Sequence, residues 1–187
     1  STDGICRLLQ LRRVAFVASE KPEMSGSAKT NQVEADMIAA MVERIFRQAD
    51  RFDYSATVGV IVPYRNQIAT VRNAIDRYGI PALHSITIDT VERFQGSQRD
   101  YIIYGLTVQQ RCQLNFLTDN VFEEDGTLID RKLNVAMTRA RKHLTIVGNP
   151  DILAGSAVYR RLMDFMKSRG CYFNVACEKF CAGDFSV

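Results

Sequence analysis

Two arginines lie where a short predicted helix runs directly into a predicted buried strand. The helix covers Leu133–Arg141, and the apolar run 144–148 follows it. Arg139 and Arg141 are therefore fixed in position, and a guanidinium group is permanently charged and presents a planar fork of N–H donors that matches phosphate oxygens. The segment predicts a phosphate contact. It is equally typical of an ordinary amphipathic helix with solvated arginines, and the segment alone does not separate the two interpretations.

A second group of polar residues lies where one predicted strand leads through a loop into the next. Gly96 lets the backbone approach a ligand closely because it has no Cβ. Gln95 and Gln98 can each donate and accept hydrogen bonds. Thr87 and Thr90 offer hydroxyl groups at the strand end, where hydroxyls commonly bind backbone phosphates.

Apolar runs typical of buried strands alternate with helical segments along the chain. Strands are expected at 13–18, 57–62, 85–90, 100–107 and 143–147, and helices at 32–49, 65–78 and 156–168, besides the arginine helix. Asn31 is expected to cap the first helix in a capping box with Glu34, and Asp130 to cap the arginine helix. The segment 109–130 is polar, with a turn at Asp125-Gly126.

Strands that alternate with helices imply βαβ units and a mainly parallel sheet covered by helices on both faces. Ligands of such sheets bind at the carboxyl ends of the strands. We therefore expect the segments after Val62 and after Thr90 to meet the arginine helix at that edge.

The composition is that of one compact domain with a substantial core. The chain has 187 residues, 47% of them hydrophobic and 24% charged, and a net charge of +3, which permits nucleic-acid binding without arguing for it. No apolar run is long enough to span a membrane. The five cysteines form no C-x-x-C pair. We therefore expect free thiols in an intracellular protein, cytoplasmic or nuclear. The alternative for the three C-terminal cysteines is a metal site formed by Cys171, Cys177 and Cys181.

Several segments together resemble superfamily 1 helicases of the Upf-like group, also called superfamily 1B. Thr90–Ile103 resembles motif V and Arg131–Arg141 resembles motif VI of the second, C-terminal RecA-like motor domain. The segments 58–67 and 31–35 and the strand end 146–150 match further family features, in the family's order. The matches span roughly residues 13–153, the expected core of a single domain 1–187, with a C-terminal helix and tail at 154–187.

The resemblance implies a three-layer α/β RecA-like P-loop NTPase fold with ATP and Mg²⁺ bound between two motor domains. The N-terminal RecA-like domain of the same polypeptide would supply the phosphate-binding loop and the magnesium ligand, and Arg139 the arginine finger. Gly96 and Gln98 would line the nucleotide site, although the family usually has Glu in place of Gln98, which implies weaker nucleotide binding. Arg141 is either a second phosphate contact or a structural ion pair.

The same resemblance places single-stranded DNA or RNA across Pro63, Tyr64 and Arg65, with translocation from five-prime to three-prime. Tyr64 would stack on a base and Arg65 would contact a phosphate. The alternative is a plain helix start, with Tyr64 packed at the rim. Gln95 would couple the nucleotide site to the nucleic-acid path, or else satisfy local backbone groups.

No G-x-x-x-x-G-K-[ST] loop occurs in the chain, and Ser25–Thr30 lacks its spacing. We therefore expect no ATP hydrolysis by this chain alone. The chain would be the second motor domain of a longer helicase. The alternative is a non-catalytic module, derived from a helicase domain, that binds nucleic acid or a protein. A flavodoxin-like regulator would need an acidic cluster at its strand ends, and Asp89 alone does not supply one.

Overall fold

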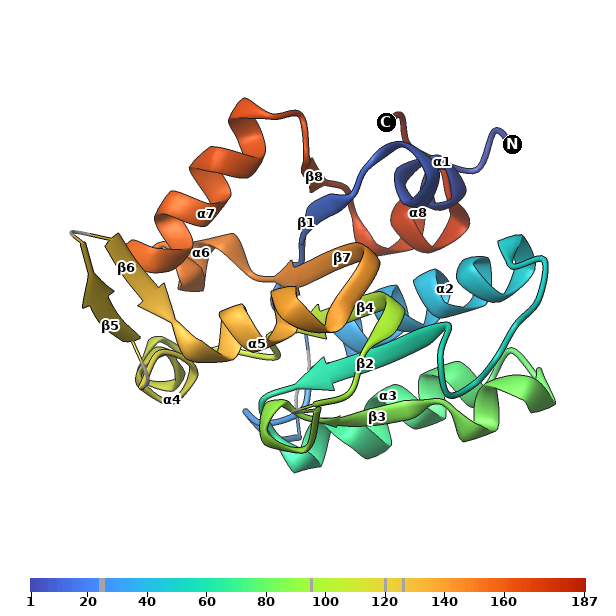
Figure 1. Ribbon diagram of the computed structural model, residues 1–187, viewed down its shortest axis with the longest axis horizontal. Helices are drawn as coiled ribbons and strands as arrows, with labels where there is room; N and C mark the ends of the chain where they lie inside the picture. Colours follow the sequence, from blue (N-terminus) through green and yellow to red (C-terminus); the bar gives the residue numbers. More distant parts are fainter. Residues whose placement is uncertain (24–25, 95, 120, 126) are drawn as a thin grey trace.

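The computed structural model describes residues 1–23, 26–94, 96–119, 121–125 and 127–187. At its centre is a six-stranded sheet in which all neighbouring strands are parallel, in the order β3-β2-β4-β7-β1-β8 (Figure 1). The strands are β1 (Val14–Ala18), β2 (Val58–Val62), β3 (Thr87–Thr90), β4 (Arg99–Gly105), β7 (Ala140–Gly148) and β8 (Tyr172–Asn174).

Helices cover both faces of this sheet (Figure 1). One face carries α1 (Gly4–Leu11), α2 (Gln32–Gln48), α3 (Arg65–Asp76) and α8 (Cys177–Ala182), and the other carries α5 (Arg131–Arg139), α6 (Pro150–Leu153) and α7 (Ala157–Ser168). Each face has its own apolar core, with Ile38 and Met41 in the first and Tyr104 and Tyr159 in the second. The predicted three-layer α/β arrangement is confirmed.

The connections contain shorter elements. These are the 3₁₀ helices η1 (Pro81–Ser85), η2 (Val91–Phe94) and η3 (Arg111–Gln113), the helix α4 (Leu114–Leu117), and an antiparallel hairpin of β5 (Val121–Glu124) and β6 (Thr127–Asp130). The hairpin occupies part of the segment that was expected to be polar with a turn at Asp125-Gly126. Asp125 lies in the turn with a left-handed φ of 51°, and Gly126 lies outside the described residues. None of the described helices is both long enough and apolar enough to cross a membrane.

The start of α2 differs in part from its prediction. Asn31 caps the helix as expected, because its side chain accepts a hydrogen bond from the Glu34 backbone N–H at 3.1 Å. The Glu34 carboxylate does not complete a capping box. The Asn31 backbone N–H donates instead to the Gln67 side chain at 2.8 Å, and Glu34 turns into the core. The predicted pairing is therefore wrong, because a tertiary partner satisfies the orphan donor.

Two large apolar side chains of the helical segments lie on the surface. Tyr78, beyond the end of α3, is 39% exposed, and Met137 on α5 is 50% exposed. The structure also contains elements that had not been predicted, namely α1 near the N-terminus and β8 and α8 near the C-terminus. These three are short, and periodicity is a weak signal for short segments.

The arginine helix reaches the opposite edge of the sheet from the one expected. α5 is a crossover that ends at Arg139, and β7 begins at the next residue, Ala140, which pairs with Arg99 at the start of β4. The end of a crossover helix must lie at the amino ends of the parallel strands. The arginines therefore lie at the amino edge, and the residues that follow β2 lie at the carboxyl edge, about 23 Å away along the seven residues of β4.

Candidate functional site

Arg139, at the end of α5, is a cation without a counter-charge among the described residues. The helix is anchored at its start, where the Asp130 side chain accepts from the Lys132 backbone N–H at 3.0 Å and from the Tyr159 hydroxyl at 3.3 Å. At the other end, Arg139 is partly exposed and forms no ion pair with any described residue, and its buried Nε lacks a hydrogen-bond partner among them. A buried, unsatisfied guanidinium donor fits an anionic ligand such as a phosphate.

The loop after η2 meets this arginine. The Gln98 side-chain amide donates to the backbone carbonyl of Thr138 at 3.3 Å, directly before Arg139. Gly96 has a left-handed φ of 79°, and no heavy atom lies within 4 Å of the place where a Cβ would stand. The structure thus brings Gln98 next to Arg139 at the amino edge, with Gly96 two residues earlier in the same loop. Gln95 lies outside the described residues.

Arg141 is occupied by structural contacts. Its Nε donates to Asp100 Oδ1 at 2.9 Å, and its Nη2 donates to the Ala56 carbonyl at 2.9 Å. Lys142 approaches the other oxygen of the Asp100 carboxylate at 3.6 Å. Of the two roles that the sequence left open for Arg141, these contacts favour the structural ion pair.

Arg99 organises the same edge, and sequence reasoning did not identify it. Its Nη1 donates to the Ser97 hydroxyl at 2.6 Å and to the Gln98 carbonyl at 2.8 Å, and its Nη2 donates to the Thr87 hydroxyl at 3.1 Å. Burial, and then the charge of Arg141, lower the pKa of Arg99. Thr87 lies at the amino end of β3, where its hydroxyl accepts from Arg99, whereas Thr90 lies at the carboxyl end of the same strand. The structure therefore does not bring these two hydroxyls together at one edge. The sequence signal that could have identified Arg99 is a charged residue at the first position of an otherwise apolar strand, β4.

The other candidate residues gather at the carboxyl edge. Pro63 is buried after β2, and Thr90 is buried at the end of β3. The Tyr64 ring is 9% exposed and stacks on Phe116 of α4, with the centroids 5.0 Å apart. Arg65 is exposed at the start of α3. Of the two interpretations of Tyr64, the burial favours packing at the rim.

A buried polar network also lies at this edge. The Glu34 carboxylate accepts hydrogen bonds from the Thr107 backbone N–H at 2.9 Å, the Ser19 hydroxyl at 2.9 Å and the Asn31 amide at 3.2 Å. The Gln67 side chain accepts from the Asn31 backbone N–H and donates to its carbonyl, both at 2.8 Å. The network joins the ends of β1 and β4 to the starts of α2 and α3. It explains why Thr107 holds a left-handed φ of 68°.

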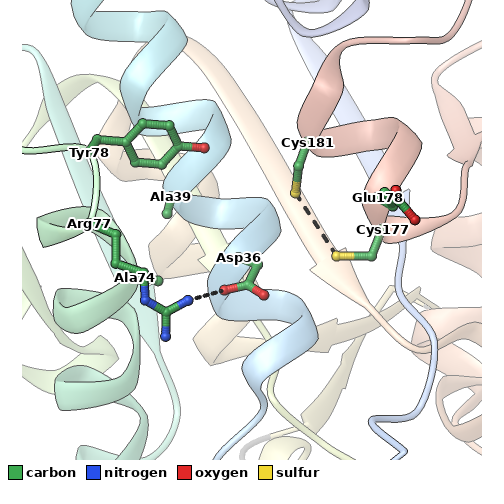
Figure 2. Close-up of a pocket in the computed structure, with 8 residues that line it drawn as sticks. All are labelled: Asp36, Ala39, Ala74, Arg77, Tyr78, Cys177, Glu178 and Cys181. Carbon is green, nitrogen blue, oxygen red and sulfur yellow. Dashed lines mark hydrogen bonds and ion pairs between the residues drawn. The ribbon is translucent and has the colours of Figure 1, made fainter.

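A cavity of about 520 Å³ lies on the helical face formed by α2, α3 and α8, away from both edges (Figure 2). Figure 2 shows the Cys177 and Cys181 thiols side by side, with their sulfurs 3.9 Å apart, and Arg77 paired with Asp36 at 3.7 Å. All five cysteines are free. The described residues contain no group of three or more His, Cys, Asp or Glu side chains that could hold a metal ion.

Comparison with known proteins gives consistent relationships. Residues 7–151 match the family model described as an AAA domain. The chain is 32% identical over 157 residues to helicase sen1 of Schizosaccharomyces pombe, covering 82% of this chain and 9% of that protein. It is 28% identical over 159 residues to the regulator of nonsense transcripts 1 homolog of Neurospora crassa (83% and 13%), and 28% identical over 156 residues to the ATP-dependent helicase NAM7 of Saccharomyces cerevisiae (81% and 15%). The chain thus spans less than a sixth of the length of each of these relatives.

Proposed function

Because this chain belongs to the AAA-domain family, among the superfamily 1 helicases of the Upf-like group, we propose that it is the second motor domain of an ATP-dependent DNA or RNA helicase or translocase. In this proposal Arg139 is the arginine finger, and the carboxyl edge forms part of the single-strand track. ATP with Mg²⁺ is held mainly by an N-terminal RecA-like domain of the same polypeptide. The observation that carries the proposal is the guanidinium of Arg139, which has no ion-pair partner among the described residues and lies beside the loop of Gly96 and Gln98.

The chemistry follows from the environment of Arg139. ATP, when bound, supplies the free energy of phosphoryl transfer, and negative charge develops on the transferred group. A guanidinium that holds that charge from a fixed helix end stabilises the transition state, and such an arginine contributes about 10³–10⁵ in rate. Asp100 already neutralises Arg141 and Lys142, whereas Arg139 forms no ion pair with any described residue and is therefore available to meet a phosphate.

The decisive experiment measures ATP turnover by the full-length parent protein, with and without single-stranded DNA or RNA, for wild type and Arg139→Ala. Wild-type turnover should rise with nucleic acid. It should fall at least about 10²-fold in Arg139→Ala while nucleotide binding persists, because the finger acts on the transition state. Arg161→Ala is the matched control, since Arg161 is exposed on α7 and should turn over like wild type.

The possible results separate the two function classes. If Arg139→Ala turns over like wild type, the assignment of the finger is wrong. If the wild type is inert with every single strand, the chain is better described as a non-catalytic module that binds nucleic acid or a protein. If the wild type is active, the better activator identifies the substrate as DNA or RNA.

A further inference from the structure

Phe116 presents an exposed aromatic ring at the carboxyl edge. Its side chain is 43% exposed, whereas the Tyr64 ring stacked on it is 9% exposed, and the two planes lie 16° apart. A strand that reaches Arg65 at the start of α3 would meet Phe116 before Tyr64. Aromatic rings in this position bind single strands without regard to sequence, because every base has a π-face.

Lys132 of α5 is tied to the segment that carries this ring. Its side chain is only 5% exposed. The ammonium donates to the Phe116 carbonyl at 2.6 Å, pairs with Asp119 Oδ1 at 3.3 Å and lies 3.9 Å from the centroid of the Phe116 ring. These are its partners among the described residues, and a buried ammonium is destabilising without partners. Any displacement of Phe116 must therefore be followed by Lys132 or break these contacts.

The helix that carries Lys132 ends at Arg139. Lys132 is in the first turn of α5 and Arg139 is its last residue, so they lie about 10 Å apart along the helix axis. α5 runs in the direction from the carboxyl edge to the amino edge, where it ends. A change at Phe116 thus acts on the same short helix that sets the position of the Arg139 guanidinium.

We propose that the contact between Phe116 and Lys132 couples single-strand binding at the carboxyl edge to the position of Arg139 at the amino edge. Phe116 contacts the strand, and Lys132 is a positioning residue that never touches nucleotide or nucleic acid. This inference rests on the proposed function, and adds to it a physical link between the two candidate sites.

The test measures single-strand affinity in the full-length parent protein, with and without a non-hydrolysable ATP analogue. The probe is fluorescent oligouridylate or oligothymidylate, whichever the wild type binds. Nucleotide should change the wild-type affinity roughly 5-fold or more, a typical size for coupling between sites. In Lys132→Met, which keeps the apolar stem, affinity without nucleotide should stay near wild type and the change on adding nucleotide should fall below about 2-fold.

Two further variants keep the result interpretable. Lys167→Met removes another ammonium that lies over a ring, 4.7 Å from Tyr172, and should keep full coupling because Lys167 is on α7. Phe116→Leu is a mild change of a partly exposed side chain, and it should weaken strand binding and also reduce the coupling. This second variant keeps the proposal testable if Lys132→Met does not fold.

The outcomes distinguish the inference from the proposed function. Suppose that nucleotide changes the strand affinity of the wild type, and that Lys132→Met and Phe116→Leu both keep the full change. The proposed link is then wrong, but the assignment as a motor domain is unaffected. A wild type that shows neither strand binding nor nucleotide dependence overturns both. Coupling lost in Lys132→Met with both separate affinities preserved supports the link, because general destabilisation would lower the affinities as well.

Discussion

Glu34 is a fully buried carboxyl group with no cation among its described contacts. Burial raises its pKa to about 7 from an ordinary value of 4.5, and the hydrogen bonds from Thr107 and Ser19 offset only part of this effect. The folded state therefore prefers the protonated form. The contribution of Glu34 to stability is complete below about pH 4.5 and is lost as the pH rises to about 7.

Glu34→Gln should remove this pH dependence, because glutamine keeps an acceptor and an N–H donor at every pH. Relative to the variant, the wild type should lose roughly 3 kcal/mol of unfolding free energy between pH 4.5 and 7.5. Urea denaturation of both chains at the two pH values measures the difference, with Glu178→Gln as a control at an exposed carboxylate. A constant gap between wild type and Glu34→Gln at both pH values would contradict the prediction.

Single residues differ in how far the sequence predicts their surroundings. The place of Arg139 at the end of a helix that leads directly into a strand could be predicted from the apolar pattern, whereas its role as a phosphate contact stays a prediction. Tyr64 could not be assigned, since a tyrosine after a strand serves equally as a base contact or as rim packing. Its stacking partner Phe116 lies 52 positions later in the sequence. Arg99 was missed because its role depends on three groups that only the folded loop brings together.

At the scale of elements, β2 and η2 meet where Gly59 faces the Phe94 ring. A Cβ on Gly59 would lie 2.8 Å from Phe94 Cζ and 3.1 Å from Arg99 Cγ. Phe94 is 1% exposed, so its ring has little room to move. Gly59→Ala should therefore destabilise the fold by about 1–3 kcal/mol, as overpacked cores generally do.

Urea denaturation of the chain carrying Gly59→Ala measures this cost. Gly26→Ala is the matched control, because no heavy atom lies within 4 Å of its Cβ position. An unfolding free energy for Gly59→Ala equal to that of wild type would show that Phe94 yields without cost. The displaced ring would also shift the loop that carries Gly96 and Gln98, so the Gln98 contact with Thr138 should weaken as well.

The elements also show where prediction from sequence ends. Strands buried on both faces read as apolar runs, and β1, β2 and β4 were found for that reason. The edge of the sheet at which α5 ends was predicted wrongly, because periodicity identifies which face of a helix is apolar but not the direction in which a crossover runs. That direction follows from the parallel pairing of β4 with β7.

For the whole molecule, the two candidate sites lie at opposite ends of the sheet, and the nine residues of α5 cover about 14 Å of the distance between them. In the proposed function, such a domain would respond to a strand at one edge and present a cation at the other, but it would supply only one part of a nucleotide site. The chain has no phosphate-binding loop, and its described residues offer no cluster for a metal ion. Neither the phosphates nor Mg²⁺ would be held by Arg139 alone.

The purified 187-residue chain should therefore hydrolyse ATP no faster than buffer, with or without single-stranded nucleic acid. Phosphate release measured over a range of chain concentrations checks this, and the same chain carrying Arg139→Ala serves as the control for a contaminating ATPase. Turnover that rises in proportion to the wild-type chain and disappears in Arg139→Ala would contradict the prediction. Activity of that kind would mean that this domain forms a complete site by itself, for instance between two copies. A separate first motor domain would then not be required for hydrolysis. The role of Arg139 would be unchanged.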